Sequence, residues 1–469
     1  MTDLETLLKS VLDEITPTPD EREKITRAYE VIKNKLEEHL RRNNVWAEVT
    51  LQGSVAHDTW LRGDRDIDVF VLYPEDWSVA DVKTKGFELI KEAVRDVGRV
   101  EIRYAEHPYI RVFVDDVEAD IVPAYKLSSP SRIRTAVDRT PFHTEFVNSH
   151  LKGGLNNDVR LLKKFMKGIG SYGAEIKTKG FSGYAVELLV IAYGGFLNVL
   201  RAASEWSPPV YVNTLGEEGL FRRAVEVLTK KYPDSVIYMP DPVDHGRNVT
   251  AAVSFEKLAR FILASKCFLR HPSKTFFENR VEYDVETLER SLGSRCIVVV
   301  EVESEKPLPP EVVWGEVDRV RDRCVKLLSG HDFAVYHSLA WTDDSRKGVI
   351  VVELDECAKP AYKLYEGPPF SELDRVSDFV SKHIGKSVKL WLDRDGRLMS
   401  VSKRPVLRAV ELLESKQREY LVSPHFKASR PVVYELTLAK LREIASKYGE
   451  EFLRASLGKV ESWLLECTS

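Results

Sequence analysis

The sequence predicts an α+β protein of several domains, led by a mixed or antiparallel sheet with helices. Three observations support this. A length of 469 residues suits two to four domains. Short alternating apolar runs between residues 47 and 122 are typical of strands, whereas residues 156–270 show mostly helical periodicity. Residues 296–354 then give a β-α-β-β pattern, which indicates a second α+β domain.

Bulk composition excludes some classes of protein. Hydrophobic residues make up 43% of the chain, enough for globular cores, and no apolar run has the length of a membrane span. The first residues lack the layout of a secretion signal. The net charge of −4 disfavours a general nucleic-acid coat protein but leaves room for a local basic face that binds RNA.

The five cysteines are scattered, odd in number and form no C-x-x-C motif. This usage indicates buried free thiols in a reducing compartment and no zinc site. We therefore expect a cytoplasmic protein.

The first long element is an amphipathic helix over residues 18–42. Thr18, Pro19 and Glu21 form a capping box with proline at the first helical position. The apolar stripe of this helix is predicted to pack on the sheet. It consists of Ile25, Ala28, Tyr29, Ile32, Leu36 and Leu40.

The next stretch, LQGSVAHDTWLRGDRDIDVFV, joins a strand over 47–52 to a second strand over 66–73. Asp66 and Asp68 alternate with apolar residues, so both carboxylates face one side while Ile67 and Val69 face a core. Paired carboxylates suit a divalent cation. Gly53 and Ser54 can bring backbone N–H groups and a hydroxyl to a phosphate chain. This combination is what metal-assisted nucleotidyl transfer requires.

A helix near 79–96 and three antiparallel strands, over 100–104, 109–114 and 117–122, complete the sheet. Asp120 lies within the third of these strands. A carboxylate in an apolar strand is costly unless it is solvated, paired or bound to a metal. Further along, residues 188–200 predict one buried apolar helix.

Several longer stretches of the sequence resemble a known family. HDTWLRGDRDIDVF, YAEHPY, EADIVPAYKL, AVDRTPFH, YGAE, GFSGYAVELL and DPVDHGRNV are similar to the archaeal type (class I) of CCA-adding enzyme. That family is a tRNA nucleotidyltransferase within the nucleotidyltransferase superfamily. The resemblance covers roughly the first half of the chain.

The resemblance implies site residues. Asp66, Asp68 and Asp120 would be the catalytic carboxylates and would hold two Mg²⁺ ions. The nucleotide would be bound by Gly53, Ser54, His57, Thr140, His143, Lys163, Tyr172 and Arg247. Other interpretations stay open for four of these: Thr140 and His143 as a turn before a helix, Lys163 as a solvated lysine, and Arg247 as an ion-pair partner of Asp241 or Asp244.

Two positions depart from the family pattern. Asp66 stands where relatives commonly carry Glu, and it is one methylene shorter. His57 stands where relatives carry an Arg that touches phosphate. A neutral His offers one donor instead of a charged fork, which puts a phosphate contact by His57 in doubt.

The second half carries less specific signals. A helix over 371–384, a hairpin over 388–401 and a helical tail over 435–465 follow the β-α-β-β pattern. The order of these elements resembles an RNA-recognition fold, although the aromatic residues of an RNP-type motif are missing. A basic stretch is either a solvated surface or a tRNA contact. Its candidate residues are Arg394, Arg397, Lys403, Arg404 and Arg408.

These inferences predict four domains: a catalytic head (1–150), a helical neck that recognises the base (151–275), an α+β body (276–430) and a helical tail (431–469), the last two binding tRNA. The expected activity is addition and repair of the 3′-terminal CCA of tRNA from CTP and ATP, with release of pyrophosphate. Family resemblance also suggests a homodimer. The alternatives are a poly(A) polymerase or other RNA-tailing enzyme, and a non-catalytic RNA-binding protein on this fold.

Overall fold

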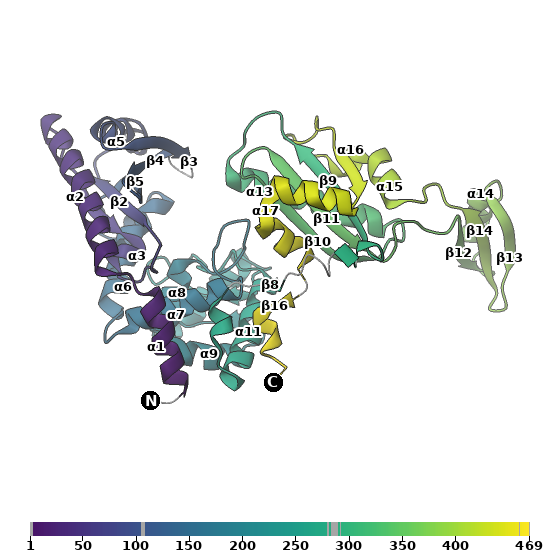
Figure 1. Ribbon diagram of the computed structural model, residues 1–469, viewed down its shortest axis with the longest axis horizontal. Coiled ribbons are helices and arrows are strands. Elements are labelled where there is room, and N and C mark those ends of the chain that lie inside the picture. Colours follow the sequence, from purple (N-terminus) through teal and green to yellow (C-terminus); the bar gives the residue numbers. More distant parts are fainter. Residues whose placement is uncertain are drawn as a thin grey trace. The chain divides into compact units, whose positions relative to one another are not determined.

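The computed structural model forms two compact units (Figure 1). Unit 1 comprises Met1–Arg280 and Glu461–Ser469, and unit 2 comprises Val281–Val460. The structure describes residues 3–104, 108–278, 281–282, 289–290, 292–458 and 460–468. Residues 105–107, inside the YAEHPY stretch, therefore lie outside the described part. The four-domain division stays a prediction.

Unit 1 begins with a five-stranded sheet in the order β1-β2-β5-β4-β3. The strands are β1 (Glu48–Gln52), β2 (Asp66–Tyr73), β3 (Arg99–Tyr104), β4 (Pro108–Val114) and β5 (Val117–Tyr125). β2 and β5 run parallel and the other neighbours antiparallel. The predicted mixed sheet and its strands are confirmed.

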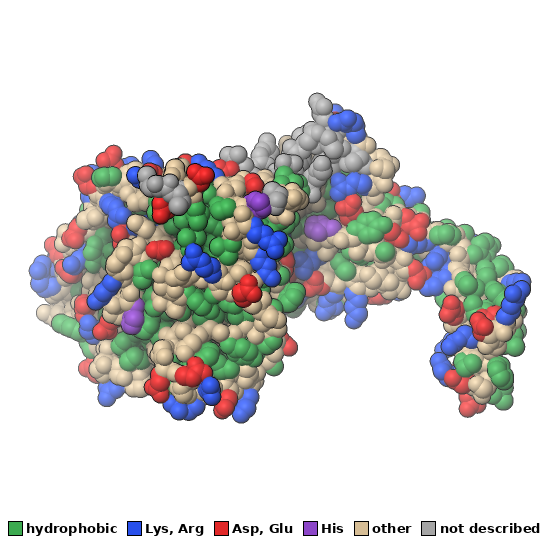
Figure 2. Space-filling model, turned by 90° about the horizontal axis from the view of Figure 1, so that it is seen from below, with side chains coloured by type: hydrophobic (Ala, Val, Ile, Leu, Met, Phe, Trp, Pro, Cys, Tyr) green, Lys and Arg blue, Asp and Glu red, His purple; other side chains and the backbone are tan. Residues whose placement is uncertain are grey.

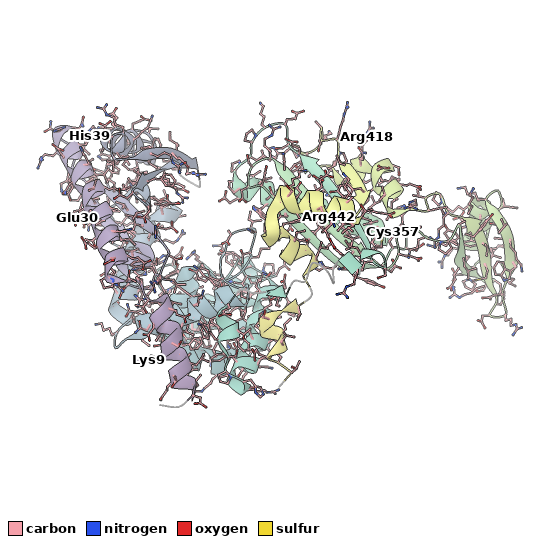
Figure 3. All side chains as sticks on the ribbon, in the orientation of Figure 1. Lys9, Glu30, His39, Cys357, Arg418 and Arg442 are labelled. Carbon is pink, nitrogen blue, oxygen red and sulfur yellow. A yellow bond between two sulfur atoms is a disulfide. The ribbon has the colours of Figure 1, made fainter. Side chains whose placement is uncertain are left out.

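The long helix α2 (Pro19–Arg42) covers this sheet. Its predicted capping box is present: the Thr18 hydroxyl accepts from the Glu21 N–H, and the Glu21 carboxylate accepts from the Thr18 N–H. Ile32 and Leu36 are fully buried against the sheet, while polar side chains such as Glu30 lie on the outer face (Figure 3). Burial of the apolar stripe holds α2 in place.

The helix expected near 79–96 is built from three segments. α4 (Val79–Asp81) leads into a π-helical turn over Val82–Gly86, and α5 (Phe87–Val94) completes the run. At the turn, the Tyr73 hydroxyl donates to the Gly86 carbonyl over 2.8 Å. A Cβ on residue 86 would lie 2.8 Å from the Tyr73 ring, so a glycine allows this close packing.

The rest of unit 1 is mainly helical. Its helices are α1 (Asp3–Ile15), α3 (Gly53–Ala56), α6 (Thr140–His150), α7 (Leu155–Gly168), α8 (Gly183–Tyr193), α9 (Phe196–Ser204), α10 (Glu218–Lys231), α11 (Phe255–Arg270) and α18 (Ser462–Leu465). Short strands β6 (Val210–Tyr211) and β7 (Ile237–Tyr238) pair in parallel. The core is aromatic: the Phe165 ring lies within 5.8 Å of the rings of Phe196, Phe268 and Phe276.

The single helix predicted over 188–200 is wrong. α8 ends at Tyr193, Gly194 and Gly195 have φ angles of 73° and 137°, and α9 starts at Phe196. Left-handed glycines end a helix readily, and the two helices meet at 90°. Among the described residues, no single helix is long and apolar enough to cross a membrane, and only this bent pair passes that test jointly.

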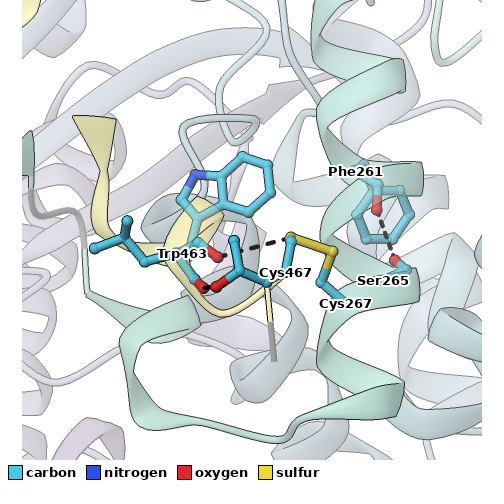
Figure 4. Close-up of a disulfide and its surroundings, with 7 residues drawn as sticks. Phe261, Ser265, Cys267, Trp463 and Cys467 are labelled. Carbon is cyan, nitrogen blue, oxygen red and sulfur yellow. Dashed lines mark hydrogen bonds between the residues drawn. A yellow bond between two sulfur atoms is a disulfide. The ribbon is translucent and has the colours of Figure 1, made fainter. Parts of the chain in front are cut away.

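The cysteines also differ from the expectation of free thiols. Disulfides join Cys267 to Cys467 (Figure 4) and Cys296 to Cys357, and only Cys324 is a free, buried thiol. The partners are 200 and 61 residues apart, and folding brings their Cα atoms to 5.0 and 5.3 Å. Sequence spacing carries no signal for such distant pairs. The first bridge ties the last segment of unit 1 to α11.

Unit 2 contains a four-stranded antiparallel sheet in the order β10-β11-β9-β15. Its strands are β9 (Cys296–Glu303), β10 (Val335–Thr342), β11 (Lys347–Leu354) and β15 (Val432–Glu435). Alternate residues of β9 serve two cores: Val298 and Val300 face α13 (Pro310–Ser329), whereas Ile297 and Val299 face α17 (Leu438–Leu457). α15 (Ala409–Ser415) and α16 (Gln417–Tyr420) pack with α13. The β-α-β-β prediction is confirmed.

A second sheet of unit 2 has the order β12-β14-β13 and is covered by α14 (Leu373–His383). The predicted hairpin is β13 (Ser387–Leu392) and β14 (Arg397–Lys403). The edge strand β12 (Tyr362–Pro369) ends in Gly-Pro-Pro, which is tolerated only at a sheet edge and hides the strand in the sequence. Figure 2 shows hydrophobic side chains among lysines and arginines on this part.

The predicted helical tail over 435–465 is interrupted. α17 is broken at Gly449, which has a φ of 81°. Beyond its end, strand β16 (Val460–Glu461) pairs with β8 (Val281–Glu282) before α18 begins. Arg442 lies on α17 before the break and pairs with Glu289 at 3.4 Å (Figure 3).

Candidate functional site

The three predicted catalytic carboxylates lie on neighbouring strands. β2 and β5 pair in parallel with Asp68 opposite Asp120 and Asp66 opposite Glu118. Because paired residues point to one face, all four carboxylates share one side of the sheet. Ile67, Val69, Ala119 and Ile121 are buried on the other side.

Their mutual repulsion changes their acidity. Burial, followed by the charges of Asp120 and Asp66, raises the pKa of Asp68 from 3.8 to about 6. Burial and the neighbouring Glu118 raise the pKa of Asp66 in the same way. A divalent cation would relieve this repulsion, so the donor chemistry fits Mg²⁺.

Asp120 has a different partner. Arg111, on β4, donates from Nε to Oδ1 and from Nη2 to Oδ2, each over 2.7 Å. Within the described residues, no three His, Cys, Asp or Glu side chains are arranged to hold a metal. A metal ion held by all three carboxylates would therefore share Asp120 with the guanidinium of Arg111.

Gly53 and Ser54 are the first two residues of α3, a single helical turn that follows β1 directly. Gly53 has a φ of 66°, and a Cβ at this position would lie 2.2 Å from Asp68 Oδ2. Glycine is therefore required here, both for its backbone conformation and for the close approach of Asp68. The turn therefore lies directly against Asp68.

A pocket of about 310 Å³ opens at this turn. It brings together eight of the predicted residues from five parts of the chain: Gly53, Ser54, His57, Asp68, Thr140, His143, Lys163 and Tyr172. It is also lined by four residues that the sequence reasoning did not single out, namely Thr144, Gly183, Tyr184 and Glu187. Such a concave site with converging polar groups is typical of a ligand pocket.

One wall of the pocket is a buried polar cluster. His57 Nδ1 donates to the Glu187 carboxylate at 3.1 Å, and His57 Nε2 lies 3.1 Å from the Thr144 hydroxyl. Lys163 Nζ donates to the carbonyl and hydroxyl oxygens of Thr59 at 3.1 and 3.0 Å. Burial lowers the pKa of Lys163, an effect that Glu187 opposes. Lys163 is thus a buried, paired lysine and not a solvated one.

A second polar cluster is centred on Asp241, which is fully buried and binds two residues of the pocket lining, His143 and Tyr184. His143 Nε2 and Arg247 Nη1 both donate to Asp241 Oδ2 at 2.8 Å, and the Tyr184 hydroxyl donates to Oδ1 at 3.3 Å. Burial opposes ionisation, but His143, the Val243 N–H and Arg247 lower the pKa of Asp241 to about 2. The ion pair foreseen for Arg247 is present, and it ties Arg247 to the pocket residue His143.

The predicted tRNA-binding residues lie in unit 2, and two of them form ion pairs. Arg404 pairs with Asp332, which also binds Lys363, and Arg408 pairs with Glu435. Arg394 and Lys403 are exposed, and Arg397 donates to the Gly367 carbonyl. The basic stretch is therefore partly neutralised.

Sequence reasoning missed Thr59, Glu187 and Arg111. Glu187 left a signal, because it is the one acid in the apolar run of α8 and an unpaired buried charge is costly. Thr59 and Arg111 gave no such signal in the sequence, since their partners are distant in the sequence or lie on another strand.

Comparisons with known proteins show which families this chain is similar to. Residues 33–143 match the family described as a nucleotidyltransferase domain, 157–278 match the second domain of tRNA nucleotidyltransferase, and 293–428 match the C-terminal domain of CCA-adding enzymes. A CCA-adding enzyme from Sulfurisphaera tokodaii is 36% identical over 98% of this chain and 100% of its own. Another from Saccharolobus shibatae is 38% identical over 84% of this chain and 88% of its own. Among solved structures, a Cid1 poly(U) polymerase with MgATP covers 60% of this chain and 99% of its own, with 17% identity and a TM-score of 0.46.

Proposed function

The chain belongs to the family of CCA-adding enzymes, and we propose that it builds or repairs the 3′-terminal CCA of tRNA from CTP and ATP. The observation that carries the proposal is the pocket beside Asp68. It joins a glycine–serine turn, a buried lysine and a histidine from separate helices next to carboxylates on adjacent strands. Transfer of a nucleotide to a hydroxyl group requires functional groups of these kinds.

In this proposal Asp66, Asp68 and Asp120 would hold two Mg²⁺ ions, which would supply positive charge for the 3′-hydroxyl and the pyrophosphate. Asp120 also helps to remove the proton from the 3′-hydroxyl of the tRNA. Arg111 holds Asp120 in place through two hydrogen bonds.

The triphosphate lies at the turn. The N–H groups at Gly53 and Ser54, the Ser54 hydroxyl, Lys163 and Tyr172 form its binding side. Lys163 supplies positive charge there, and the close packing around Gly53 keeps the phosphates next to Asp68. Thr140, at the start of α6, lies on the same pocket wall as His143.

Arg247 and His143 read the base. Both are held by Asp241, so their positions are fixed before a nucleotide arrives. An arginine donates to acceptors on cytosine and on adenine. The protein thus selects CTP or ATP without a nucleic-acid template.

The tRNA is held by the second half of the chain. Arg394, Arg397, Lys403, Arg404 and Arg408 contact its phosphates, and the working form is a homodimer, as in the family. Light scattering of the purified protein tests the oligomeric state.

An extension assay tests the activity. The protein is mixed with Mg²⁺, a tRNA transcript that lacks CCA, and labelled CTP, ATP or both. We expect two C additions from CTP alone and one further A when ATP is present. A long ladder from ATP alone would indicate a poly(A)-type enzyme, and tight tRNA binding without incorporation would indicate a non-catalytic protein.

A further inference from the structure

Glu187 is a buried carboxylate inside an otherwise apolar stretch of α8. Its side chain is 4% exposed, and its neighbours Val186 and Leu188 pack in the core. It accepts hydrogen bonds from His57 Nδ1 at 3.1 Å and from the Thr59 hydroxyl at 2.5 Å. A charge in such a place is stable only with partners of this kind.

Thr59 connects Glu187 to Lys163 through hydrogen bonds. The hydroxyl of Thr59 donates to Glu187 and accepts from Lys163 Nζ, whose distance to Glu187 Oε1 is 3.7 Å. The Thr59 carbonyl accepts a second hydrogen bond from the ammonium group. An ammonium group has three donors, so one remains for an anion in the pocket that Lys163 lines.

His57 is held in the same cluster. Both of its ring nitrogens have partners, Glu187 on one side and Thr144 on the other. His57 therefore forms part of the pocket lining beside the Gly53–Ser54 turn. Direct donation to a phosphate would require its ring to leave one of these partners. The family pattern has an arginine at this position, and the histidine found here is paired with Glu187 instead.

We propose that Glu187 and Thr59 are positioning residues which fix Lys163 for binding the triphosphate, while Glu187 also holds His57 in the lining of the pocket. This inference rests on the proposed function and adds two residues to it. CTP and ATP share the triphosphate, so disruption of the cluster weakens both nucleotides equally. Loss of a base-reading residue would instead affect them unequally.

The first test replaces Thr59 in the full chain. Thr59→Val keeps the shape but removes the hydroxyl, and Thr59→Ser keeps the hydroxyl. Binding of CTP, ATP and inorganic tripolyphosphate is measured by calorimetry in the absence of tRNA. Because a hydrogen bond to a charged group is lost, we expect Thr59→Val to weaken all three about tenfold, and Thr59→Ser to stay within about threefold of wild type.

A second variant, Glu187→Gln, removes the charge and keeps the size. Without the carboxylate, the buried Lys163 loses the neighbour that favours its charged form. We expect a similar loss for all three probes, with KM for CTP and ATP raised by the same factor and kcat changed less. This variant keeps the proposal open to refutation if Thr59→Val does not fold.

Asp158→Asn is the matched control. Asp158 accepts from the Phe196 N–H at 2.7 Å, so it is a partly buried carboxylate that holds α9 and lies outside the pocket. We expect this variant to lower the thermal midpoint and to leave tripolyphosphate binding unchanged.

The outcomes separate the two proposals. Unchanged tripolyphosphate binding in both Thr59→Val and Glu187→Gln would overturn the positioning role, and so would an equal loss in Asp158→Asn. If wild type fails to extend tRNA while Thr59→Val still weakens tripolyphosphate binding, the proposed function fails and the positioning role stands.

Discussion

Arg111 and Asp120 face each other on adjacent strands and are joined by two parallel hydrogen bonds of 2.7 Å. Such a bidentate pair fixes both groups. It also occupies both oxygens of the carboxylate that would complete the metal site with Asp66 and Asp68. Arg111 and a metal ion therefore compete for Asp120.

This competition can be measured with Arg111→Gln. Removal of the guanidinium makes the net charge around the cluster of carboxylates more negative, so Mg²⁺ should stabilise the protein at a lower concentration than in wild type. Thermal midpoints across a magnesium titration provide the measurement. Arg103→Gln, which breaks a pair with Glu101 on β3, is the control; an equal shift in both variants would contradict the competition.

Asp68→Asn should abolish C and A addition and leave tRNA binding largely intact. Loss of a metal ligand removes several kcal/mol of transition-state stabilisation, which corresponds to about a thousandfold or more in rate. Single-turnover extension and a filter-binding assay give the two readouts. Asp115→Asn is the control, because Asp115 lies in a turn with a φ of 53° that asparagine tolerates. Near-normal turnover of Asp68→Asn would remove Asp68 from the metal site.

The same variant should change how stability depends on pH in metal-free buffer. The pKa of Asp68 is raised from 3.8 to about 6, so between these values the folded state binds more protons than the unfolded state. Stability contributed by this group therefore falls as pH rises through that window. We expect Asp68→Asn to unfold at a higher temperature than wild type at pH 7, with the difference shrinking toward pH 4. A constant difference would show that Asp68 does not titrate in this range.

Arg247→Ala should disturb the choice between CTP and ATP more than it weakens tRNA binding. The substitution removes a base-reading donor and frees one side of Asp241. Misincorporation at each of the three added positions is the measurement. Arg222→Ala, on the exposed face of α10, is the control; a selective loss of tRNA affinity in Arg247→Ala would refute the assignment.

The exposed and the paired basic residues of unit 2 should differ in their effect on tRNA binding. Neutralising Arg394 and Lys403 should flatten the salt dependence of binding by about one unit of slope for each contact. Arg404 and Arg408 should change it less, because Asp332 and Glu435 already offset their charge. Affinity measured over a series of salt concentrations tests this, and an unchanged slope in both pairs would place the tRNA elsewhere.

Local patterns in the sequence predicted local structure well. The alternation around Asp66 and Asp68 located β2, and the capping box at Thr18 located the start of α2. The predictions failed where distant contacts decide. Nothing near Cys267 indicates Cys467 as its partner. The error over 188–200 has a local cause instead, because Gly194 and Gly195 stand within the run and break it. The clusters around Glu187 and Asp241 depend on helices that only the folded chain brings together.

The return of residues Glu461–Ser469 to unit 1 has a consequence for biosynthesis. These residues follow all of unit 2 along the chain, so the ribosome releases them only after unit 2 has emerged. Until then α11 lacks the segment bound through Cys467, and the Arg260–Glu461 ion pair cannot form. The nucleotide pocket can therefore assemble early on the nascent chain, whereas the support behind α11 is added last.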